Sequence, residues 1–269
     1  MELITQPVQK ALSKTGIPLG NYVFNPFRGC LIGCKYCYVQ CNRGIKKINK
    51  DWGEYLYIKE NIIEVLKKEL DILNDIRRIL IGSTTEAFQP IDRYKQITPV
   101  AIELMKSKNI PFVILTKQPD VSEYAELITS LPENMVYITI NSEIVRKLFE
   151  KRSSPIEERL FAIEKCSKYN VKTIAYIGPF FPFLTDLEEL LKKLHKKTKM
   201  IYIEAYHPNM GNFEEIKKLL SGNTDTLKVL ENERNYYEYW NKTKEDIKKL
   251  NSKYEYEIKF FIPNYSKYY

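Results

Sequence analysis

This sequence is short of the residue types on which several classes of protein depend. Its 269 residues include only two histidines, ten glycines and thirteen prolines. Glycine and proline at this level exclude a fibrous or low-complexity chain. No run approaches the roughly 18 apolar residues of a membrane span, and residues 1–16 lack the apolar core of a secretory signal. With 44% hydrophobic residues available for a core, we expect a soluble, cytoplasmic protein of one large domain or two modest ones.

Negative charge is also scarce, because 42 lysines and arginines face 34 aspartates and glutamates, which leaves a net charge of +8. This excess is compatible with nucleic acid or an anionic cofactor, but basic runs such as residues 191–200 are more typical of a solvated helix face. Segments 231–246 and 263–269 interleave aromatic and basic residues, a pattern on which single-stranded nucleic acid can stack. Packing of these tyrosines against the fold is the simpler interpretation, so nucleic acid is a weakly supported partner.

Strand and helix patterns alternate along most of the chain. Short apolar and β-branched runs predict strands, and apolar residues at helical spacing predict helices between them. The predicted strands are 22–25, 78–83, 111–116, 135–141, 171–179, 200–207 and 256–262. The predicted helices are 61–73, 97–109, 121–131, one within 153–170, 184–197, 213–220 and 225–252.

Repeated strand–helix units of about 30 residues imply a parallel sheet with helices outside it. A doubly wound sheet and a barrel would both use such units. The chain is short for a complete eight-stranded barrel, whereas a partial TIM-like (β/α)6 barrel fits its length. We therefore expect an α/β fold with a core domain over residues 1–222. Residues 223–269 would add a helix and a possible final strand, packed on that core.

Cysteine is rare but concentrated, because four of the five cysteines lie within twelve residues. They are Cys30, Cys34, Cys37 and Cys41, in a C-x3-C-x2-C spacing with one further cysteine four residues on. Thiols crowded in this way indicate a metal site in a cytosolic chain, rather than structural disulfides. The fifth, Cys166, falls on the apolar face of its predicted helix and is expected to be buried in the core.

Three kinds of metal site use thiol ligands. A structural zinc site needs four ligands, usually as two separated pairs, and neither His195 nor His207 lies near the cysteines in sequence. A closed four-cysteine cluster would resemble a ferredoxin and make an electron carrier, which needs no large α/β body. In the third kind, Cys30, Cys34 and Cys37 bind three irons of a [4Fe–4S] cluster and leave the fourth iron open to a substrate or cofactor. We favour this third interpretation.

The cysteine spacing, with an aromatic residue before the third cysteine, resembles the signature of radical S-adenosylmethionine (radical SAM) enzymes. Four further segments resemble motifs of the spore photoproduct lyase-like subgroup of that superfamily. In order along the chain, the matching stretches are NPFRGCLIGCKYCYV (25–39), ILIGSTTEAFQPID (79–92), VILTKQP (113–119), SSPIEERLFAI (153–163) and IGPFFPFLTD (177–186). Five matches in the same order argue against chance. The superfamily's fold is the partial (β/α)6 barrel expected above.

The resemblance implies an enzyme that binds one [4Fe–4S] cluster through Cys30, Cys34 and Cys37 and holds S-adenosylmethionine (SAM) at the open iron. Such enzymes cleave SAM with one electron, and the resulting 5′-deoxyadenosyl radical abstracts hydrogen from a substrate. The electron implies a partner, a low-potential donor of the ferredoxin or flavodoxin type. Cys41 is expected not to be a ligand, because a fourth thiolate would close the open iron. Whether the reaction is of the lyase or the transferase type stays open.

The same resemblance implies cofactor contacts at the carboxyl ends of the strands, where parallel barrels build their sites. In the family, an aromatic residue lies beside the adenine, and residues after the first strand beyond the cluster face the methionyl amine. A lysine or an arginine suits the carboxylate, and an asparagine–serine pair suits the ribose. Turn residues, helix caps or surface charges are the structural alternatives for these positions. The candidate residues are Tyr36, Ser83, Thr84, Thr85, Glu86, Lys117, Asn141, Ser142 and Arg159.

The chain departs from the subgroup in one respect that bears on its reaction. The name-giving enzyme repairs a thymine dimer in DNA and uses a cysteine as hydrogen donor, near the strand that residues 79–92 match. This chain has no cysteine between Cys41 and Cys166. That absence argues against the same DNA repair, so the substrate stays unidentified. Tyr38, directly after the third cluster cysteine, is a candidate hydrogen donor.

Overall fold

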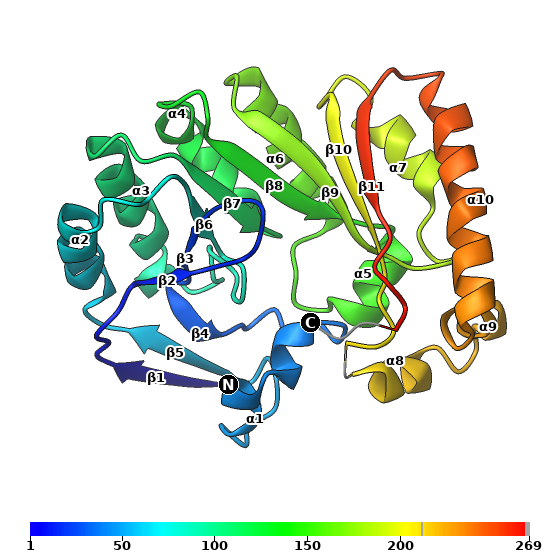
Figure 1. The fold of residues 1–269 in the computed structure, drawn as a ribbon, viewed down its shortest axis with the longest axis horizontal. Helices are drawn as coiled ribbons and strands as arrows, with labels where there is room; N and C mark the ends of the chain where they lie inside the picture. The colour runs from blue at the N-terminus through cyan, green and yellow to red at the C-terminus, as the bar shows by residue number, and fades with distance from the viewer. Residues whose placement is uncertain (211, 267–269) are drawn as a thin grey trace.

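The computed structural model describes residues 1–210 and 212–266, and its main feature is a curved eight-stranded sheet (Figure 1). The strand order is β11-β10-β9-β8-β7-β6-β3-β2, in which only the β2–β3 pair is antiparallel. The sheet does not close, because β2 and β11 are its two edges. It is a partial TIM-like barrel, as predicted. The strands are β2 (Leu12–Lys14), β3 (Tyr22–Phe24), β6 (Ile79–Ile81), β7 (Phe112–Thr116), β8 (Met135–Ile140), β9 (Lys172–Phe180), β10 (Met200–Ala205) and β11 (Glu257–Phe261).

Helices pack on the outer face of the sheet, with α2, α3 and α10 along the outside of the arc in Figure 1. Their apolar sides contribute residues such as Leu66, Ile102, Ile163 and Trp240 to the main hydrophobic core. Cys166 is fully buried there, as predicted. The helices are α1 (Arg43–Lys46), α2 (Ile62–Ile72), α3 (Ile97–Ser107), α4 (Ala125–Ile128), α5 (Glu143–Phe149), α6 (Ile156–Lys168), α7 (Leu187–Leu194), α8 (Phe213–Leu219), α9 (Thr224–Leu230) and α10 (Glu233–Asn251).

Two predicted helices are interrupted in the structure. Segment 121–131 begins as a 3-10 helix, η3 (Pro119–Tyr124), which runs into the short α4. Segment 225–252 divides into α9 and α10, because the side-chain oxygen of Asn232 accepts a hydrogen bond from the Asn235 N–H and caps a new helix. Apolar spacing does not reveal such a competing cap, so the sequence predicted one long helix.

A small second sheet, which the sequence did not predict, lies beside the barrel. Its order is β1–β5–β4, formed by β1 (Glu2–Gln6), β5 (Tyr55–Lys59) and β4 (Phe27–Gly29). Phe27, Leu31, Leu56 and Ile58 form its own buried cluster. Because β4 ends at Gly29, this sheet leads directly into the cysteine loop and fixes where the loop begins.

The C-terminal region joins the main sheet rather than a separate one. β11 pairs parallel with β10, and Tyr236 and Trp240 of α10 are fully buried in the main core. The proposed division at residue 222 stays a prediction. Of the aromatic and basic segment 263–269, residues 267–269 lie outside the described residues. Among the residues that the structure describes, no helix is long and apolar enough to cross a membrane.

The two faces of the central strands differ in composition. Residues such as Ile138, Ala175 and Ile203 are fully buried in the main core. Alternate residues on the same strands lie outside that core and are half-buried, among them Tyr176 and Tyr202. Because successive side chains of a strand point to opposite faces, these tyrosines belong to the concave face of the sheet.

Candidate functional site

The cysteine loop leaves β4 through backbone turns that require glycine. Gly29 has φ +94°, and a Cβ there would lie 2.8 Å from the Tyr55 carbonyl oxygen. Gly33 has φ +60°, and a Cβ there would lie 2.9 Å from the Cα of Gly53. Positive φ and close backbone approach both favour glycine. These glycines therefore let the loop turn between β4 and Cys34 while packed on the small sheet.

Residues after β6 hold the start of the loop. The Thr85 hydroxyl donates to the Gly29 carbonyl oxygen at 2.6 Å, and the Gln89 side-chain oxygen accepts from the Leu31 N–H at 3.0 Å. Gln89 also donates to the Thr85 oxygen at 3.0 Å. Cys30 lies between the two anchored residues. All these bonds are buried, so the backbone on both sides of Cys30 is fixed.

The three predicted ligands are free thiols. They lie near enough to one another that a thiolate at one raises the pKa of another. Burial raises the pKa of Cys30, while hydrogen bonds from the backbone N–H groups of Glu86 and Ile32 oppose this effect. Burial also raises the pKa of Cys34, and it raises that of Cys37 to about 12. The thiols therefore stay protonated at neutral pH unless a metal deprotonates them, as coordination does.

The donor set fits an iron–sulfur cluster. Cysteine thiolates are the usual protein ligands of such clusters. The positive charge of Lys117 favours the thiolate forms of Cys34 and Cys37. In the described part of the chain, no three or more His, Cys, Asp or Glu side chains converge as ligands of one metal ion. The ligands of a [4Fe–4S] cluster need not converge on one metal position, because each thiolate binds a different iron.

Cys41 lies at the end of a 3-10 helix, η1 (Tyr38–Cys41), which follows directly after Cys37. It is half-buried, and its charge is among those that raise the pKa of Cys37. Cys41 is therefore near enough to Cys37 that distance alone does not explain why it would not be a ligand. The reason for the prediction is that a fourth thiolate would close the open iron. It stays a prediction.

Tyr36 lies in a buried charged network that sequence reasoning missed. Its hydroxyl donates to the carboxylate of Glu150, 114 residues later. Arg159 donates to the other Glu150 oxygen at 2.8 Å, and both members of this ion pair are fully buried. The Lys117 ammonium lies 5.8 Å from the centroid of the Tyr36 ring. Arg159 is therefore not a surface arginine, and its contact with the cofactor stays a prediction.

The residues after β6 divide into two groups. Ser83 and Thr84 are half-exposed and lie beside Asn25, whose side-chain oxygen accepts from the Thr84 N–H at 3.0 Å. Thr85 and Glu86 are buried and bonded to the protein. Glu86 accepts from the Thr116 hydroxyl at 2.5 Å and from the Lys117 N–H at 2.9 Å. It therefore joins the ends of β6 and β7, while its contact with the methionyl amine stays a prediction.

Asn141 and Ser142 bind the end of β9 and the loop that follows it. The Asn141 amide donates to the Pro179 carbonyl at 2.8 Å and accepts from the Thr185 hydroxyl, and the Ser142 oxygen accepts from the Asp186 N–H at 2.6 Å. Asn141 is fully buried. The structure gives both residues a packing role, and the ribose contact stays a prediction.

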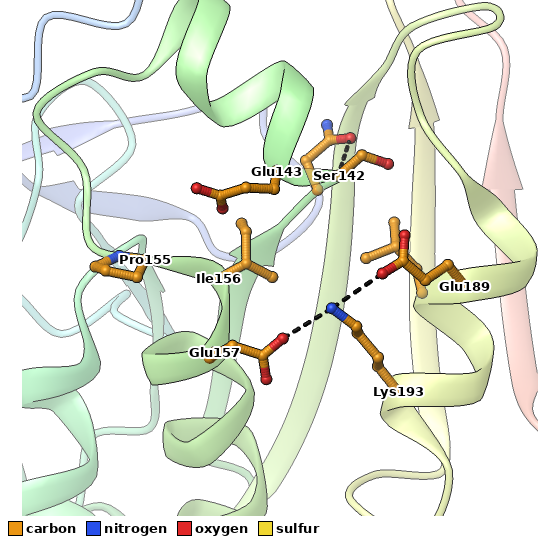
Figure 2. A pocket seen from close by; sticks show the side chains of 9 residues that line it. Ser142, Glu143, Pro155, Ile156, Glu157, Glu189 and Lys193 are labelled. Atoms are coloured by element: carbon orange, nitrogen blue, oxygen red, sulfur yellow. Dashed lines mark hydrogen bonds and ion pairs between the residues drawn. The ribbon is translucent and has the colours of Figure 1, made fainter.

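Both residues also line a cavity of about 210 Å³ among α5, α6 and α7 (Figure 2). Lys193 lies there between Glu157, at 2.8 Å, and Glu189, at 3.0 Å. These acidic residues occupy the first turns of α6 and α7, where carboxylates stabilise helix ends. No cysteine lines this cavity, and its charges are explained by the helices themselves.

The concave face near the end of the cysteine loop is rich in tyrosine. The rings of Tyr137, Tyr176 and Tyr202 lie 5.7 to 6.5 Å apart, centroid to centroid. The Tyr176 hydroxyl donates to the carboxylate of Glu204. Partial burial and the charges of Cys37 and Glu204 raise the pKa of Tyr38 to about 12. The Tyr38 hydroxyl donates to the carbonyl oxygen of Ser83, after β6, at 3.4 Å.

The fold and the thiol loop together define an enzyme of the radical SAM class. The sequence model of the radical SAM superfamily matches residues 24–194, which is more than half of the chain. The chain belongs to the radical SAM superfamily. It is 27% identical over 252 residues to an uncharacterised protein of Methanocaldococcus jannaschii, a match that covers 93% of this chain and 94% of that protein.

Spore photoproduct lyase is similar in both sequence and fold. The Clostridium acetobutylicum enzyme is 28% identical over 187 residues, which cover 67% of this chain and 53% of that protein. A solved cysteine-to-serine variant of spore photoproduct lyase has a TM-score of 0.64 at 19% identity, covering 81% of this chain and 66% of that one. A variant with bound AdoMet and dinucleoside spore photoproduct has a TM-score of 0.63 at 19% identity, with the same coverage. These structural likenesses show the fold.

Proposed function

We propose that this chain binds one [4Fe–4S] cluster through Cys30, Cys34 and Cys37, binds SAM beside it, and abstracts hydrogen from a substrate. The observation that carries the proposal is the cysteine loop, in which buried hydrogen bonds fix both neighbours of Cys30 and the Lys117 charge favours the thiolate forms of Cys34 and Cys37. When bound, the cluster and SAM supply the electron transfer and the 5′-deoxyadenosyl radical.

The chain's own residues bind and orient. Lys117 supplies positive charge at the end of β7, which suits the methionyl carboxylate as well as the thiolates. Ser83 and Thr84 are half-exposed and offer hydroxyl oxygens to the methionyl amine. Tyr36, beside Cys37 in sequence, offers its ring to the adenine. Glu86 holds the Lys117 backbone through a hydrogen bond, while Thr85 and Gln89 hold the residues on either side of Cys30.

We propose that the substrate lies against the tyrosine-rich concave face. Tyr137, Tyr176 and Tyr202 supply aromatic surface there, and Glu204 supplies a hydrogen-bond acceptor. Tyr38, directly after Cys37 and 39% exposed, is our candidate hydrogen donor. One solved spore photoproduct lyase binds a dinucleoside spore photoproduct. The lack of a cysteine between Cys41 and Cys166 argues that this chain treats a different substrate, by a lyase- or transferase-type reaction.

Two further requirements belong to the proposal. The reaction needs one electron per cleavage, so a low-potential ferredoxin or flavodoxin is the expected partner. Such donors operate in the cytoplasm, which is the expected location. Nucleic acid is a weakly supported partner, for which the net charge of +8, the aromatic and basic segments 231–246 and 263–269 and the likeness to spore photoproduct lyase speak.

Anaerobic reconstitution with iron and sulfide tests the proposal. We expect about four irons per chain, as one [4Fe–4S] cluster requires, and slow release of 5′-deoxyadenosine after reduction with SAM present. A fully reconstituted protein that cleaves no SAM would contradict it, and stoichiometric zinc without iron uptake would favour a structural zinc site. Deuterium transfer into 5′-deoxyadenosine from labelled tRNA, DNA, lipid or metabolite pools would then identify the substrate class.

A further inference from the structure

Glu150 is a buried carboxylate that no sequence motif singled out. It follows directly after α5 and is fully buried. One carboxylate oxygen accepts from Arg159 at 2.8 Å and from the Ser153 hydroxyl at 3.1 Å. The other oxygen accepts from the hydroxyl of Tyr36. Glu150 therefore joins the α5–α6 connection to the cysteine loop.

The ion pair beneath Tyr36 is itself firmly held. Arg159 also donates to the Thr139 carbonyl at 2.9 Å and to the Ser154 carbonyl at 3.0 Å. Its guanidinium is thus bonded to the end of β8 and to the α5–α6 connection, and its position in turn fixes Glu150. An ionised acceptor held in this way makes a stronger hydrogen bond to a hydroxyl than a neutral acceptor does.

Tyr36 has little freedom above this pair. Its ring centroid lies 6.3 Å from that of Phe149 and 6.1 Å from that of Phe181, and the Lys117 ammonium lies 5.8 Å from it. The N–H of Lys35, the preceding residue, donates to the Phe149 carbonyl at 2.8 Å. The end of α5 therefore fixes both the backbone of Lys35 and the ring of Tyr36, directly before Cys37.

The two carboxylate oxygens of Glu150 have different partners, and the Tyr36 hydroxyl donates to the one that Arg159 does not contact. Arg159 and Ser153 already occupy one Glu150 oxygen, and burial alone would penalise the charge that the carboxylate carries. The hydrogen bond from Tyr36 joins the second oxygen of this charged group to the one aromatic residue between Cys34 and Cys37. The pair thus has the geometry of a support for Tyr36.

We propose that Glu150 is a positioning residue, which sets the orientation of the Tyr36 ring and through it the affinity for the adenosyl part of SAM. It acts through Tyr36 and does not touch the cofactor. The inference depends on the proposed function, because it takes Tyr36 to face SAM. It assigns to the Glu150–Arg159 pair a role beyond the stability of the fold.

Tyr36→Phe tests the proposal with the ion pair left intact. The reconstituted variant should bind iron like the wild type, while its KM for SAM in 5′-deoxyadenosine formation rises about two- to tenfold, the range that one hydrogen bond contributes. The EPR spectrum of the reduced cluster with SAM should also shift relative to the wild type. Glu150→Gln should change the same quantities in the same direction. In the double variant the effects should not add, because both changes remove one interaction.

Tyr256→Phe is the matched control, because the hydroxyl of Tyr256, the residue before β11, donates to the Leu191 carbonyl of α7 at 2.6 Å in a buried site. This control should lower the melting temperature but leave the KM and the EPR spectrum unchanged. If Tyr36→Phe behaves like the control, the proposal is wrong. If Glu150→Gln fails to fold, Tyr36→Phe still decides. A wild-type protein that shows no EPR response to SAM would instead overturn the proposed function.

Discussion

The side-chain oxygen of Gln89 accepts a 3.0 Å hydrogen bond from the backbone N–H of Leu31, the residue that follows Cys30. Gln89 also donates to Thr85, and Thr85 donates to the carbonyl of Gly29, the residue that precedes Cys30. Two residues after β6 thus hold both neighbours of one predicted cluster ligand. The loop's position therefore depends on buried bonds as well as on the cysteines.

Thr85→Val should destabilise the protein before any metal is added. Valine keeps the shape but loses the hydroxyl, which leaves the Gly29 carbonyl and one Gln89 N–H without their buried partner. Each loss costs about 1–3 kcal/mol. Urea unfolding of the metal-free protein should show a lower midpoint for Thr85→Val, while Thr85→Ser stays close to the wild type. Equal midpoints for the valine and serine variants would show that the bonds contribute nothing.

Gly29→Ala should disturb the entry to the cysteine loop. The new methyl group would lie 2.8 Å from the Tyr55 carbonyl oxygen, in a backbone with φ +94°. We expect a loss on the order of 1–3 kcal/mol in the free energy of unfolding, with less iron bound per chain. Gly222→Ala is the control, because nothing lies within 4 Å of its new Cβ. If Gly29→Ala and Gly222→Ala have the same iron content and the same stability, the alanine at position 29 causes no backbone strain and the prediction is wrong.

Glu150 should make the protein sensitive to acid. Burial alone would raise the pKa of Glu150, but the charges of Arg159 and Lys117 and the bond from Tyr36 lower it to about 2 from an ordinary value of 4.5. As the pH falls, Glu150 is therefore protonated in the unfolded chain before it is protonated in the folded protein. The stabilisation, on the order of 3 kcal/mol, is complete above about pH 4.5 and is lost as the pH falls toward 2.

Urea unfolding of the metal-free protein between pH 6 and pH 3 measures this effect. The wild type should lose stability as the pH falls below about 4.5. Glu150→Gln should start from a lower stability, because Arg159 is left buried without its partner, and should change less with pH. If both proteins lose stability in parallel over this range, other carboxylates account for the acid sensitivity.

The barrel was predictable because its strands are short apolar runs between amphipathic helices. Phe112–Thr116 and Met135–Ile140 are mostly buried, and each is followed by helical structure. The small sheet was not predictable. Glu2–Gln6 is largely exposed and partly polar, and Phe27–Gly29 has only three residues. These strands exist because distant segments pair, and no local pattern records that pairing.

The site was predictable only where it is encoded in consecutive residues. Cys30, Cys34 and Cys37 lie in one loop, so their spacing alone indicated a cluster. Glu150 looks like an ordinary polar residue at a helix end, followed by Lys151. Its burial depends on Arg159 and on Tyr36, which is 114 residues away. The available signal was Arg159 itself, since an arginine buried beneath a helix requires a carboxylate partner.

The central claim is that three cysteines hold one cluster with an iron left open for SAM. EPR of the reduced, reconstituted Cys41→Ala protein, recorded before and after addition of SAM, tests it most directly. We predict a signal for the [4Fe–4S] cluster that changes on adding SAM, as in the wild type, whereas Cys34→Ala should give no such signal. Loss of the cluster in both variants, or a wild-type signal that ignores SAM, would contradict the claim and favour a closed, electron-carrying cluster.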